Sequence, residues 1–322
     1  MKSQRGAALL LAMLTVALVA TLASAALWQQ WRSAEVESAE RRRLQASWIL
    51  IGALDWARLI LREDARSNQN SGAADHLGEP WATPLEEARL SSFLAADKNN
   101  SAEELMPAFL SGEMIDLQSR LNFRNLVKTT GAGAQAKAEV SAADVATFTR
   151  LFSLLNLPAT ELTVATANLL KTTQQAVSDP QPSESPLLPQ RFAQLRWLGL
   201  SAHTLTVLQP HVTVLPERSL LNLNTASAEA LSASIAGLDL ALAQQVVTSR
   251  ATTPFTDLKG AITRIPGATD KTVNAQTHDV RSRFFEVRAR LRLDDTLIEE
   301  RSLVQRNGMS TQVRWRERVA AS

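Results

Sequence analysis

The segment Ala7-Ala-Leu-Leu-Leu-Ala-Met-Leu-Thr-Val-Ala-Leu-Val-Ala-Thr-Leu-Ala-Ser-Ala-Ala-Leu27 decides how this chain is organised. It contains no charged residue, and at ~1.5 Å rise per residue a helix of this length spans the hydrocarbon core of a bilayer. Lys2 and Arg5 precede it, so the positive-inside rule places the amino end in the cytoplasm and the rest of the chain outside. Trp28 and Trp31 follow it, where aromatic rings mark a membrane interface. We therefore predict a single-pass transmembrane helix over residues 7–27.

A cleavable secretory signal is the alternative interpretation of the same segment. Ala23-Ser24-Ala25 offers the small residues that such a cleavage site needs. The helical pattern does not stop there, because residues 32–66 contain no proline and their apolar side chains recur at three- and four-residue steps. We expect one helix over 7–66, roughly 90 Å long, with a polar loop over 68–75 after it. Its second half should pack on a globular domain through Leu44, Trp48, Ile51, Leu54, Ala57 and Leu61.

The junction Arg5-Gly6-Ala7 resembles the leader of type IV prepilins, in which a short basic segment abuts the apolar helix. This resemblance implies that a prepilin peptidase cuts after Gly6 and methylates the new amino terminus at Ala7. Pilins and most pseudopilins have Glu as the fifth mature residue, whereas here that position is Leu11. A carboxylate in a bilayer is costly unless it has a partner, which in those families is the amine of the subunit above. Leu11 therefore favours a subunit at the tip of a fibre, although it also suits a plain membrane anchor.

The middle of the chain mixes strand and helix signals. Residues 114–127 alternate roughly between apolar and polar side chains, which indicates a strand or hairpin. Ser141 followed by Asp144 is typical of a helix start. The helical pattern continues from there to Val177, with a break at Pro158.

A repeated helical unit follows. Leu221-Asn-Leu-Asn-Thr-Ala-Ser-Ala-Glu-Ala-Leu231 precedes a glycine-containing turn and a helix over 241–250, and a related unit occupies 258–273. The pattern resembles a double helix-hairpin-helix module, whose DNA-binding members expose backbone amides to phosphate. Asp239 stands beside the position expected for the phosphate, which favours a scaffold role over DNA binding. Positive charge near these turns is sparse and comes from Arg250, Lys259, Arg264 and Lys271.

The end of the chain predicts an antiparallel sheet. Residues 281–293 alternate cleanly between apolar and charged side chains, and partner strands are expected over 297–306 and 311–316. The turns would lie at Asp294-Asp295 and Asn307-Gly308. We expect the apolar face to pack on the long helix. The opposite face should be solvated and paired across strands with residues such as Glu299, and it carries Glu286, Arg288, Arg290 and Arg292.

Composition and the remaining motifs oppose an enzyme. The sequence has no cysteine, its four histidines lack metal-ligand spacing, and it contains neither a nucleophile elbow nor a phosphate loop. Removing Lys2 and Arg5 with the leader would leave 34 minus 2, or 32, basic side chains against 32 acidic ones. This balance favours neither nucleic acid nor an anionic surface. Acidic pairs such as Glu86-Glu87, Glu103-Glu104 and Asp294-Asp295 are more often solvated than metal-binding, and we expect no catalytic residue and no cofactor.

The order of these parts resembles the K-type minor pseudopilins of the type II secretion system, the GspK family. The resemblance implies an α+β fold in which a long transmembrane and amphipathic helix lies on a pilin-like antiparallel sheet. It also implies a large all-α insertion that contains the helix-hairpin-helix (SAM-like) units. It rests on the glycine-ended leader, on Leu11 and on the segments Ile115-Asp-Leu-Gln-Ser-Arg-Leu-Asn-Phe-Arg-Asn-Leu126, Val214-Leu-Pro216, Leu221-Asn-Leu-Asn-Thr-Ala226, Phe255 and Ser282-Arg-Phe-Phe-Glu-Val287.

The same resemblance implies a place in the cell and a set of partners. We expect a protein of the bacterial inner membrane whose main domain is periplasmic. It would sit at the pseudopilus tip and start assembly with I- and J-type minor pseudopilins, and it would also meet other pseudopilins and the prepilin peptidase. The implied parts are a leader at 1–6, the long helix at 7–66, a first pilin-like part at 67–138, an inserted helical domain at 139–277, and closing strands with a tail at 278–322.

Three questions stay open from the sequence. Some K-type relatives hold structural calcium through oxygen ligands, but no EF-hand pattern is present, so metal ligands are unassigned. A membrane-anchored helix-hairpin-helix protein for DNA binding or uptake is the alternative function, and DNA affinity that weakens steeply with salt would favour it. An anchored enzyme whose site joins residues remote in sequence would instead need a pocket with converging carboxylates.

Overall fold

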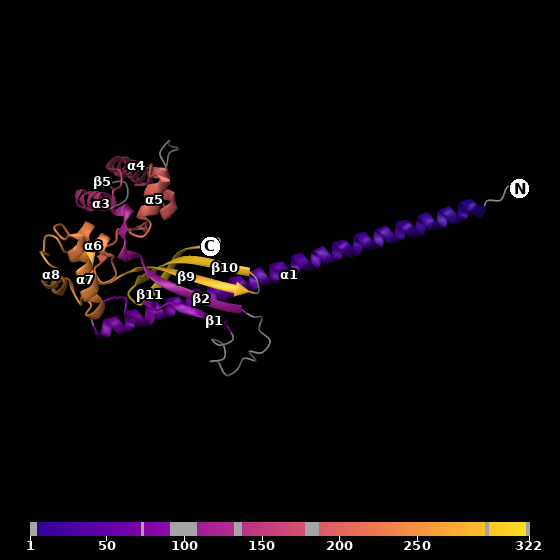
Figure 1. The fold of residues 1–322 in the computed structure, drawn as a ribbon, viewed down its shortest axis with the longest axis horizontal. Coiled ribbons are helices and arrows are strands. Elements are labelled where there is room, and N and C mark those ends of the chain that lie inside the picture. The colour runs from indigo at the N-terminus through magenta and orange to yellow at the C-terminus, as the bar shows by residue number, and fades with distance from the viewer. Residues whose placement is uncertain are drawn as a thin grey trace.

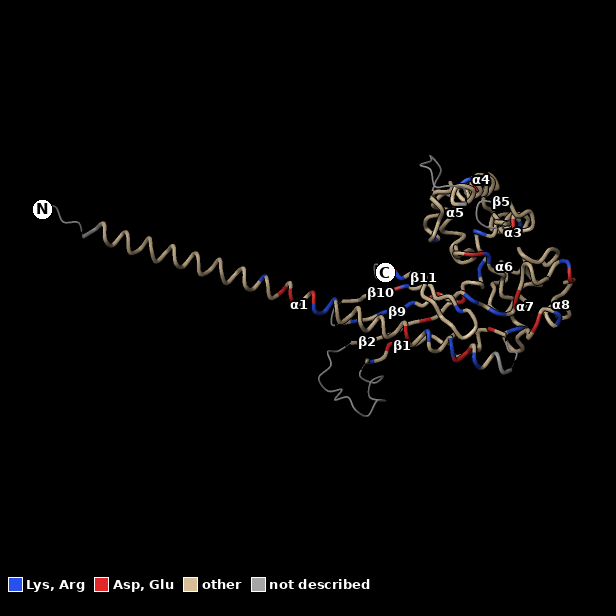
Figure 2. Tube along the Cα trace, turned by 180° about the vertical axis from the view of Figure 1, so that it is seen from behind, with Lys and Arg blue, Asp and Glu red and all other residues tan. Residues whose placement is uncertain are grey.

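The computed structural model describes residues 5–71, 74–90, 108–131, 137–177, 187–293 and 296–319. Helix α1 (Arg5–Ser71) projects far from the rest at its amino end, and a body of helices lies beside its other end (Figure 1). Figure 2 shows no charged residue along most of the projecting part, and charged residues appear on it only near the sheet. Among the described residues, α1 is the one helix long and apolar enough to cross a membrane. The span predicted over residues 7–27 falls within it.

Helix α1 is longer than the sequence pattern indicates. It ends at Ser71, so the loop predicted to begin at Asn68 is wrong for its first residues. The Asn68 side chain donates hydrogen bonds to Asp64, one turn earlier, at 3.5 Å and to Glu79 at 3.3 Å. Asn68 therefore has one hydrogen-bond partner within α1 and another in the segment that follows it.

A five-stranded antiparallel sheet lies against the carboxyl-terminal half of α1. Its order is β1 (Leu85–Arg89), β2 (Ala108–Asp116), β9 (Phe284–Leu293), β10 (Thr296–Asn307) and β11 (Ser310–Val319). Strand β2 pairs with β9 from Ala108 opposite Leu293 to Asp116 opposite Phe285, so segments on both sides of the helical body form one sheet. The three predicted C-terminal strands are confirmed, while the turn at Asp294-Asp295 lies outside the described residues.

The two faces of the sheet follow the predicted alternation. The apolar side chains of β9 are buried, and Arg288, Arg290 and Arg292 lie on the opposite face. Arg290 pairs with Glu299 across strands at 3.0 Å, and Arg288 pairs with Glu113 at 2.9 Å. The arginine row is thus an ion-paired outer face. The buried face packs on α1 through Ala46, Leu50, Leu54, Ala57 and Leu61.

Part of the predicted packing face of α1 is wrong. Leu44 and Trp48 are 59% and 70% exposed, because the sheet contacts the opposite side of the helix. Three- and four-residue spacing describes two apolar stripes on this part of α1. The sequence alone does not say which of them meets the sheet.

The strand or hairpin predicted over 114–127 is also largely wrong. Strand β2 ends at Asp116, and two short 3-10 turns follow, at Leu117–Ser119 and Phe123–Leu126. Asp116 and Asn122 each accept a hydrogen bond from a backbone N–H two residues further on, at Gln118 and Arg124. Such local bonds curl the backbone and remove it from the sheet.

The helical body forms a second hydrophobic core. The helix predicted to start at Ser141 is confirmed, with the hydroxyl of this residue bonded to Asp144 at 2.5 Å. The core also takes in Leu121, Phe123 and Leu126, which precede the predicted boundary at residue 139. The helices are α3 (Ala142–Leu154), α4 (Ala159–Val177), a 3-10 helix (Phe192–Leu198), α5 (Ala202–Leu208), α6 (Ala228–Ser234), α7 (Leu240–Thr252) and α8 (Leu258–Arg264).

The two predicted hairpin units differ. In the first, Gly237 (φ 87°) joins α6 to α7, and in the second Gly267 (φ 72°) follows α8. Glycine suits both turns because other residues rarely adopt a positive φ. Residues 268–277 are turns and loop, so the second unit has no second helix. The short pairs β3 (Leu121–Asn122) with β6 (Val212–Thr213), β4 (Val127–Thr130) with β5 (Lys137–Val140), and β7 (Leu221–Asn222) with β8 (His278–Asp279) tie the body together.

Candidate functional site: a buried polar junction

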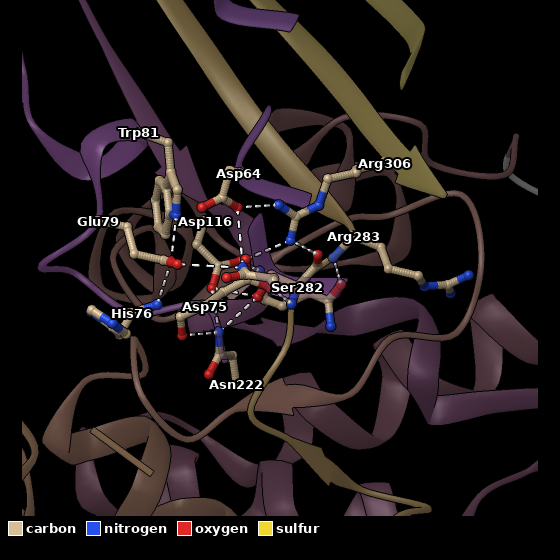
Figure 3. Close-up of polar contacts among 12 residues, drawn as sticks. Asp64, Asp75, His76, Glu79, Trp81, Asp116, Asn222, Ser282, Arg283 and Arg306 are labelled. Carbon is tan, nitrogen blue, oxygen red and sulfur yellow. Dashed lines mark hydrogen bonds and ion pairs between the residues drawn. The ribbon is translucent and has the colours of Figure 1, made fainter. Parts of the chain in front are cut away.

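Polar side chains from six separate segments meet where α1, the sheet and the helical body come together (Figure 3). They are buried or nearly so. The principal members are Asp64, Asp75, Asp116, Asn222, Ser282 and Arg306. We call this group the polar junction.

Asp116 is the acceptor at the centre of the junction. One carboxylate oxygen accepts from the Gln118 backbone at 2.7 Å. The other lies 2.6 Å from the Ser282 hydroxyl, 2.5 Å from that of Thr225 and 3.2 Å from the amide nitrogen of Asn222. Burial raises the pKa of Asp116 to about 6, and these hydrogen bonds offset only part of that effect. The end of β2 is thereby tied to the segment before β9 and to the helical body.

The segment Leu221–Ala226 supplies the contacts from the helical body. The Asn222 amide nitrogen lies 2.9 Å from the Ser282 hydroxyl and 3.2 Å from the Asp75 carbonyl. The Asn224 side chain donates to the Phe255 carbonyl at 2.9 Å and accepts from the Phe255 backbone N–H at 2.8 Å. Arg250 donates to the carbonyls of Leu223 and Ala226. These hydrogen bonds fix the segment in place, so Leu221–Ala226 has a structural role.

Arg306 of β10 supplies the positive charge of the junction. Its guanidinium lies 2.5 Å from Asp64 and 2.5 Å from Asp75, and it donates to the Ser282 carbonyl at 2.9 Å. Burial acts to lower the pKa of Arg306, but the attraction of Asp75 and Asp64 outweighs it and the pKa is raised. Burial and the nearby Glu79 raise the pKa of Asp64 to about 7, against the opposing effect of Arg306. One guanidinium therefore links α1, the loop that follows α1, and the sheet.

Glu79 closes the junction on the side of the sheet. It accepts from the Trp81 indole at 2.7 Å and from the His76 backbone at 2.8 Å. Trp81 is fully buried and packs edge-on against Phe285, with ring centroids 5.1 Å apart. The polar junction thus continues directly into the apolar core between α1 and the sheet.

Asp64, Asp75 and Glu79 are the one group of carboxylates in the described residues close enough to hold a metal ion together, with oxygens within 4.8 Å of one another. Calcium takes six to eight oxygen ligands. Here Arg306 donates to two of the three carboxylates, and the third accepts from Trp81 and His76. A guanidinium occupies the place that a cation would need, so these residues do not fit calcium in this arrangement.

The residues predicted for processing lie far from the junction. Gly6 and Ala7 fall in the first turns of α1, and Leu11 is exposed on its projecting part (Figure 1). The histidines do not form a site. His278 is buried, and burial lowers its pKa to about 4, while its ring nitrogens lie within hydrogen-bond distance of the hydroxyls of Thr277 and Ser234.

The hairpin units lack the features of a phosphate site. Asp239 precedes α7, and its carboxylate accepts from the Leu242 backbone at 2.8 Å. Asp257 caps α8 in the same way, accepting from Gly260 at 2.7 Å. A carboxylate on a helix amino terminus takes the position that an anion would need and repels it. These contacts oppose phosphate binding at the amino termini of α7, which follows the first hairpin, and of α8.

The junction joins segments that sequence motifs singled out separately. Asp116 belongs to Ile115–Leu126, Asn222 and Thr225 to Leu221–Ala226, and Ser282 to the last motif. Sequence reasoning gave none of these residues a role, and it missed Asp64, Asp75 and Arg306 altogether. A short polar residue inside each apolar motif was the available signal, because a buried polar group needs a partner.

A helix long and apolar enough to cross a membrane, laid on an antiparallel sheet with a helical body inserted between two of its strands, defines a pilin-like subunit. Two models of one family, described as type II secretion system (T2SS), protein K, match residues 119–217 and 221–281. The chain belongs to this family, and it is a minor pseudopilin of type II secretion.

Two known proteins illustrate the similarity. The type II secretion system protein K of Pseudomonas aeruginosa PAO1 is 27% identical over 313 residues, covering 91% of this chain and 86% of the relative. A chain in the crystal structure of the GspK-GspI-GspJ complex from the enterotoxigenic Escherichia coli type 2 secretion system superposes with a TM-score of 0.63. That match covers 88% of this chain and 99% of the other, at 18% identity.

Proposed function

We propose that this protein sits at the tip of the pseudopilus and starts its assembly together with I- and J-type minor pseudopilins, for protein export across the outer membrane. The observation that carries the proposal is the position of the helical body at the end of α1 that lies far from the amino terminus, where it projects to one side of that helix (Figure 1). With the amino end in the inner membrane, this body would be the most distal part of the subunit. It would block the stacking of a further subunit above it.

Leu11 supports the proposal from the other end of the molecule. In a head-to-tail fibre, each subunit needs one surface for the neighbour above and another for the neighbour below. A subunit at the tip has no neighbour above, so it needs no carboxylate at the fifth mature position to meet one. We propose cleavage after Gly6 and methylation of Ala7, with Leu11 becoming that fifth residue. The mass of the mature protein, measured after co-expression with a prepilin peptidase, tests the cleavage, and a cut near Ala25 would contradict it.

The partners are proposed by analogy with the matched complex, whose title names GspK, GspI and GspJ. The main domain would lie in the periplasm, where the junction fixes the helical body on the sheet. A rigid link is what a capping subunit needs, because a body that swung freely would not block one side of the fibre.

Labelling of assembled fibres tests the tip assignment. A single cysteine placed at the exposed Met309 provides the label, since the chain has no cysteine of its own. Gold particles at one end of each pseudopilus are the expected result in electron micrographs. Particles spaced along the fibre would overturn the proposal, as would a failure of the I- and J-type proteins to bind at micromolar concentration.

A further inference from the structure

A groove of about 540 Å³ lies between the edge strand β11 and the helical body. Leu303 and Trp315 line it from the sheet, and Arg124, Arg191 and Leu215 line it from the body. No principal member of the polar junction takes part in its described lining. Ligand-binding pockets usually measure about 300–1,000 Å³ and combine apolar walls with a few polar groups. We call this space the arginine groove.

Arg124 is a half-buried cation in the wall of the groove, and its guanidinium has no hydrogen bond or ion pair with any described residue. Burial lowers the pKa of Arg124, and no neighbouring carboxylate among the described residues offsets that effect. Arg250 and Arg306 are buried as well, but each donates to carbonyl or carboxylate oxygens. A desolvated cation without a partner is costly, so Arg124 calls for an anion from outside the chain.

Trp315 supplies a second donor without a partner, from the side of the sheet. Its indole nitrogen is the one buried side-chain nitrogen or oxygen among the described residues that has no hydrogen-bond partner. Buried polar groups in folded proteins nearly always have partners, so an exception needs an explanation. Arg191 lies 3.9 Å above the centre of the Trp315 ring and pairs with Glu317 at 3.1 Å. Two unpaired donors, one from the body and one from the sheet, therefore line the same groove.

A β-bulge in β11 adds a further cation. Leu303 of β10 pairs with Trp315, and Val304 pairs with Val313, so Arg314 is the extra residue of β11. Bulges at sheet edges turn side chains out of the normal alternation and oppose the addition of another strand. Among the described residues, three arginines and one glutamate line the groove, so its walls carry an excess of positive charge. A ligand would therefore be held through these side chains and would carry negative charge.

We propose that the arginine groove binds an acidic segment of another protein, with an Asp or Glu carboxylate of that segment on Arg124. This site does not depend on where the protein sits in the fibre. Guanidinium groups bind carboxylates through two parallel hydrogen bonds, and no described residue occupies the donors of Arg124. The apolar wall at Val214, Leu215 and Pro216 would hold the side chains that flank the carboxylate.

The size and position of the groove favour a protein segment over other anions. The groove is much larger than one carboxylate or phosphate and has an apolar wall, which a free ion would leave unused. Thr311 of β11 accepts from Arg58 of α1, which lies roughly 45 Å of helix beyond Leu27. With residues 7–27 in the membrane, a lipid phosphate does not reach that height.

Binding of synthetic peptides to the full chain in detergent micelles tests the class of ligand. The probes are acetylated pentapeptides with Asp or Glu at the centre and varied apolar flanks, each matched by its Asn or Gln counterpart. We expect the tightest acidic peptide to bind about tenfold or more tightly than its counterpart, as a charged hydrogen-bonded pair allows. A set in which no acidic peptide exceeds its counterpart would overturn the proposal. Inorganic phosphate that binds as tightly as the best peptide would also overturn it, because the groove would then be a site for any anion.

Arg124→Met separates binding from folding. It should weaken the best acidic peptide about tenfold or more while the melting temperature is kept or raised, because it removes a half-buried cation that lacks a partner. Glu317→Gln should tighten binding, since it removes a carboxylate that competes for Arg191. Arg318→Gln changes an exposed arginine of β11 outside the groove, and as the matched control it should alter neither quantity.

Two results with these variants would contradict the proposal. Peptide binding by Arg124→Met that equals the binding of the wild type would show that the carboxylate does not sit on Arg124. A melting temperature that falls in Arg124→Met but not in Arg318→Gln would show that Arg124 serves the fold instead.

Discussion

Helix α1 is attached to the rest of the chain in two physically different ways. Along its carboxyl-terminal half it packs on the sheet through apolar side chains, among them Leu50, Leu54 and Leu61. Near its end it is tied through Asp64 to Arg306, in a junction of charges and hydrogen bonds. We call this apolar contact between α1 and the sheet the apolar seam. Its stabilisation is spread over many side chains, so removing one of them loses only part of it. The junction concentrates its stabilisation on one guanidinium, and its removal leaves buried charges without a partner.

This difference bears on function. The apolar seam sets how α1 lies on the sheet, while the junction sets how the helical body is mounted on both. A tip subunit needs the second property as much as the first. The following changes separate the two attachments, and they are ordered by the size of the expected effect.

The largest effect is expected for Arg306→Met. The substitution leaves Asp64 and Asp75 buried beside each other without a positive partner, which costs about 3–5 kcal/mol. Arg314→Met is the matched control, because Arg314 is exposed and donates a hydrogen bond to the side chain of Gln312. We expect the control to change the free energy of unfolding by less than about 0.5 kcal/mol. Urea unfolding followed by tryptophan fluorescence measures both variants.

Adding Asp64→Asn to Arg306→Met shows whether the penalty comes from the unpaired charge. Removing one of the two stranded carboxylates should restore part of the lost stability. A single Arg306→Met variant that loses less than about 1 kcal/mol would mean that water reaches the junction and that the two attachments do not differ as described.

Leu54→Ala tests the apolar seam. Leu54 is buried against the sheet, so the substitution leaves a cavity and should cost about 2–3 kcal/mol. Leu59→Ala, on the exposed side of the same helix, should cost less than about 0.5 kcal/mol in the isolated protein. Equal losses of stability in the two variants would show that the exposed side of α1 is already covered within the subunit.

The two attachments also differ in how far the sequence predicts them. The seam follows from periodicity, because Leu54, Ala57 and Leu61 recur at helical spacing and residues 284–293 alternate as a strand. Even there, the pattern wrongly predicted that Leu44 and Trp48 pack on the sheet, because a helix with two apolar stripes offers two candidate faces. Only the folded chain shows which stripe meets the sheet.

The junction was beyond this kind of reasoning. Asp64 and Arg306 lie 242 residues apart, and neither belongs to a local pattern that marks it as buried. Local propensity also failed at residues 117–126, where Asp116 and Asn122 bend the backbone by bonding to it. Contacts between remote polar residues leave no period in the sequence. That the pilin-like parts on both sides of the helical body belong to one domain was, by contrast, expected from the family resemblance.

A change of pH probes the junction without disturbing the seam. The pKa of Asp116 is raised to about 6 in the folded protein, from an ordinary value of 3.8. Between these values the folded state binds more protons than the unfolded state, so this residue makes the protein less stable as the pH rises. The stabilisation is present at low pH and is lost as the pH rises through about 6.

Comparing wild type with Asp116→Asn isolates this effect. Lowering the pH from 8 to 5 should stabilise the wild type relative to the variant by on the order of 1 kcal/mol. His278, whose pKa burial lowers to about 4, destabilises the fold in acid, but it is present in both proteins and cancels in the difference. A difference that does not vary with pH would show that Asp116 ionises as readily as an exposed carboxylate.

The smallest effect is expected for calcium. Arg306 already pairs with Asp64 and Asp75, and Glu79 accepts from Trp81 and His76, so a divalent ion would have to displace a guanidinium. That exchange exposes a cation to a cation and requires the junction to open. We therefore expect the melting temperature to shift by less than about 1 °C between excess EDTA and millimolar calcium, since about 1 kcal/mol corresponds to a few degrees. A larger rise in calcium that disappears in Glu79→Gln would show that the three carboxylates bind the ion and that Arg306 moves aside.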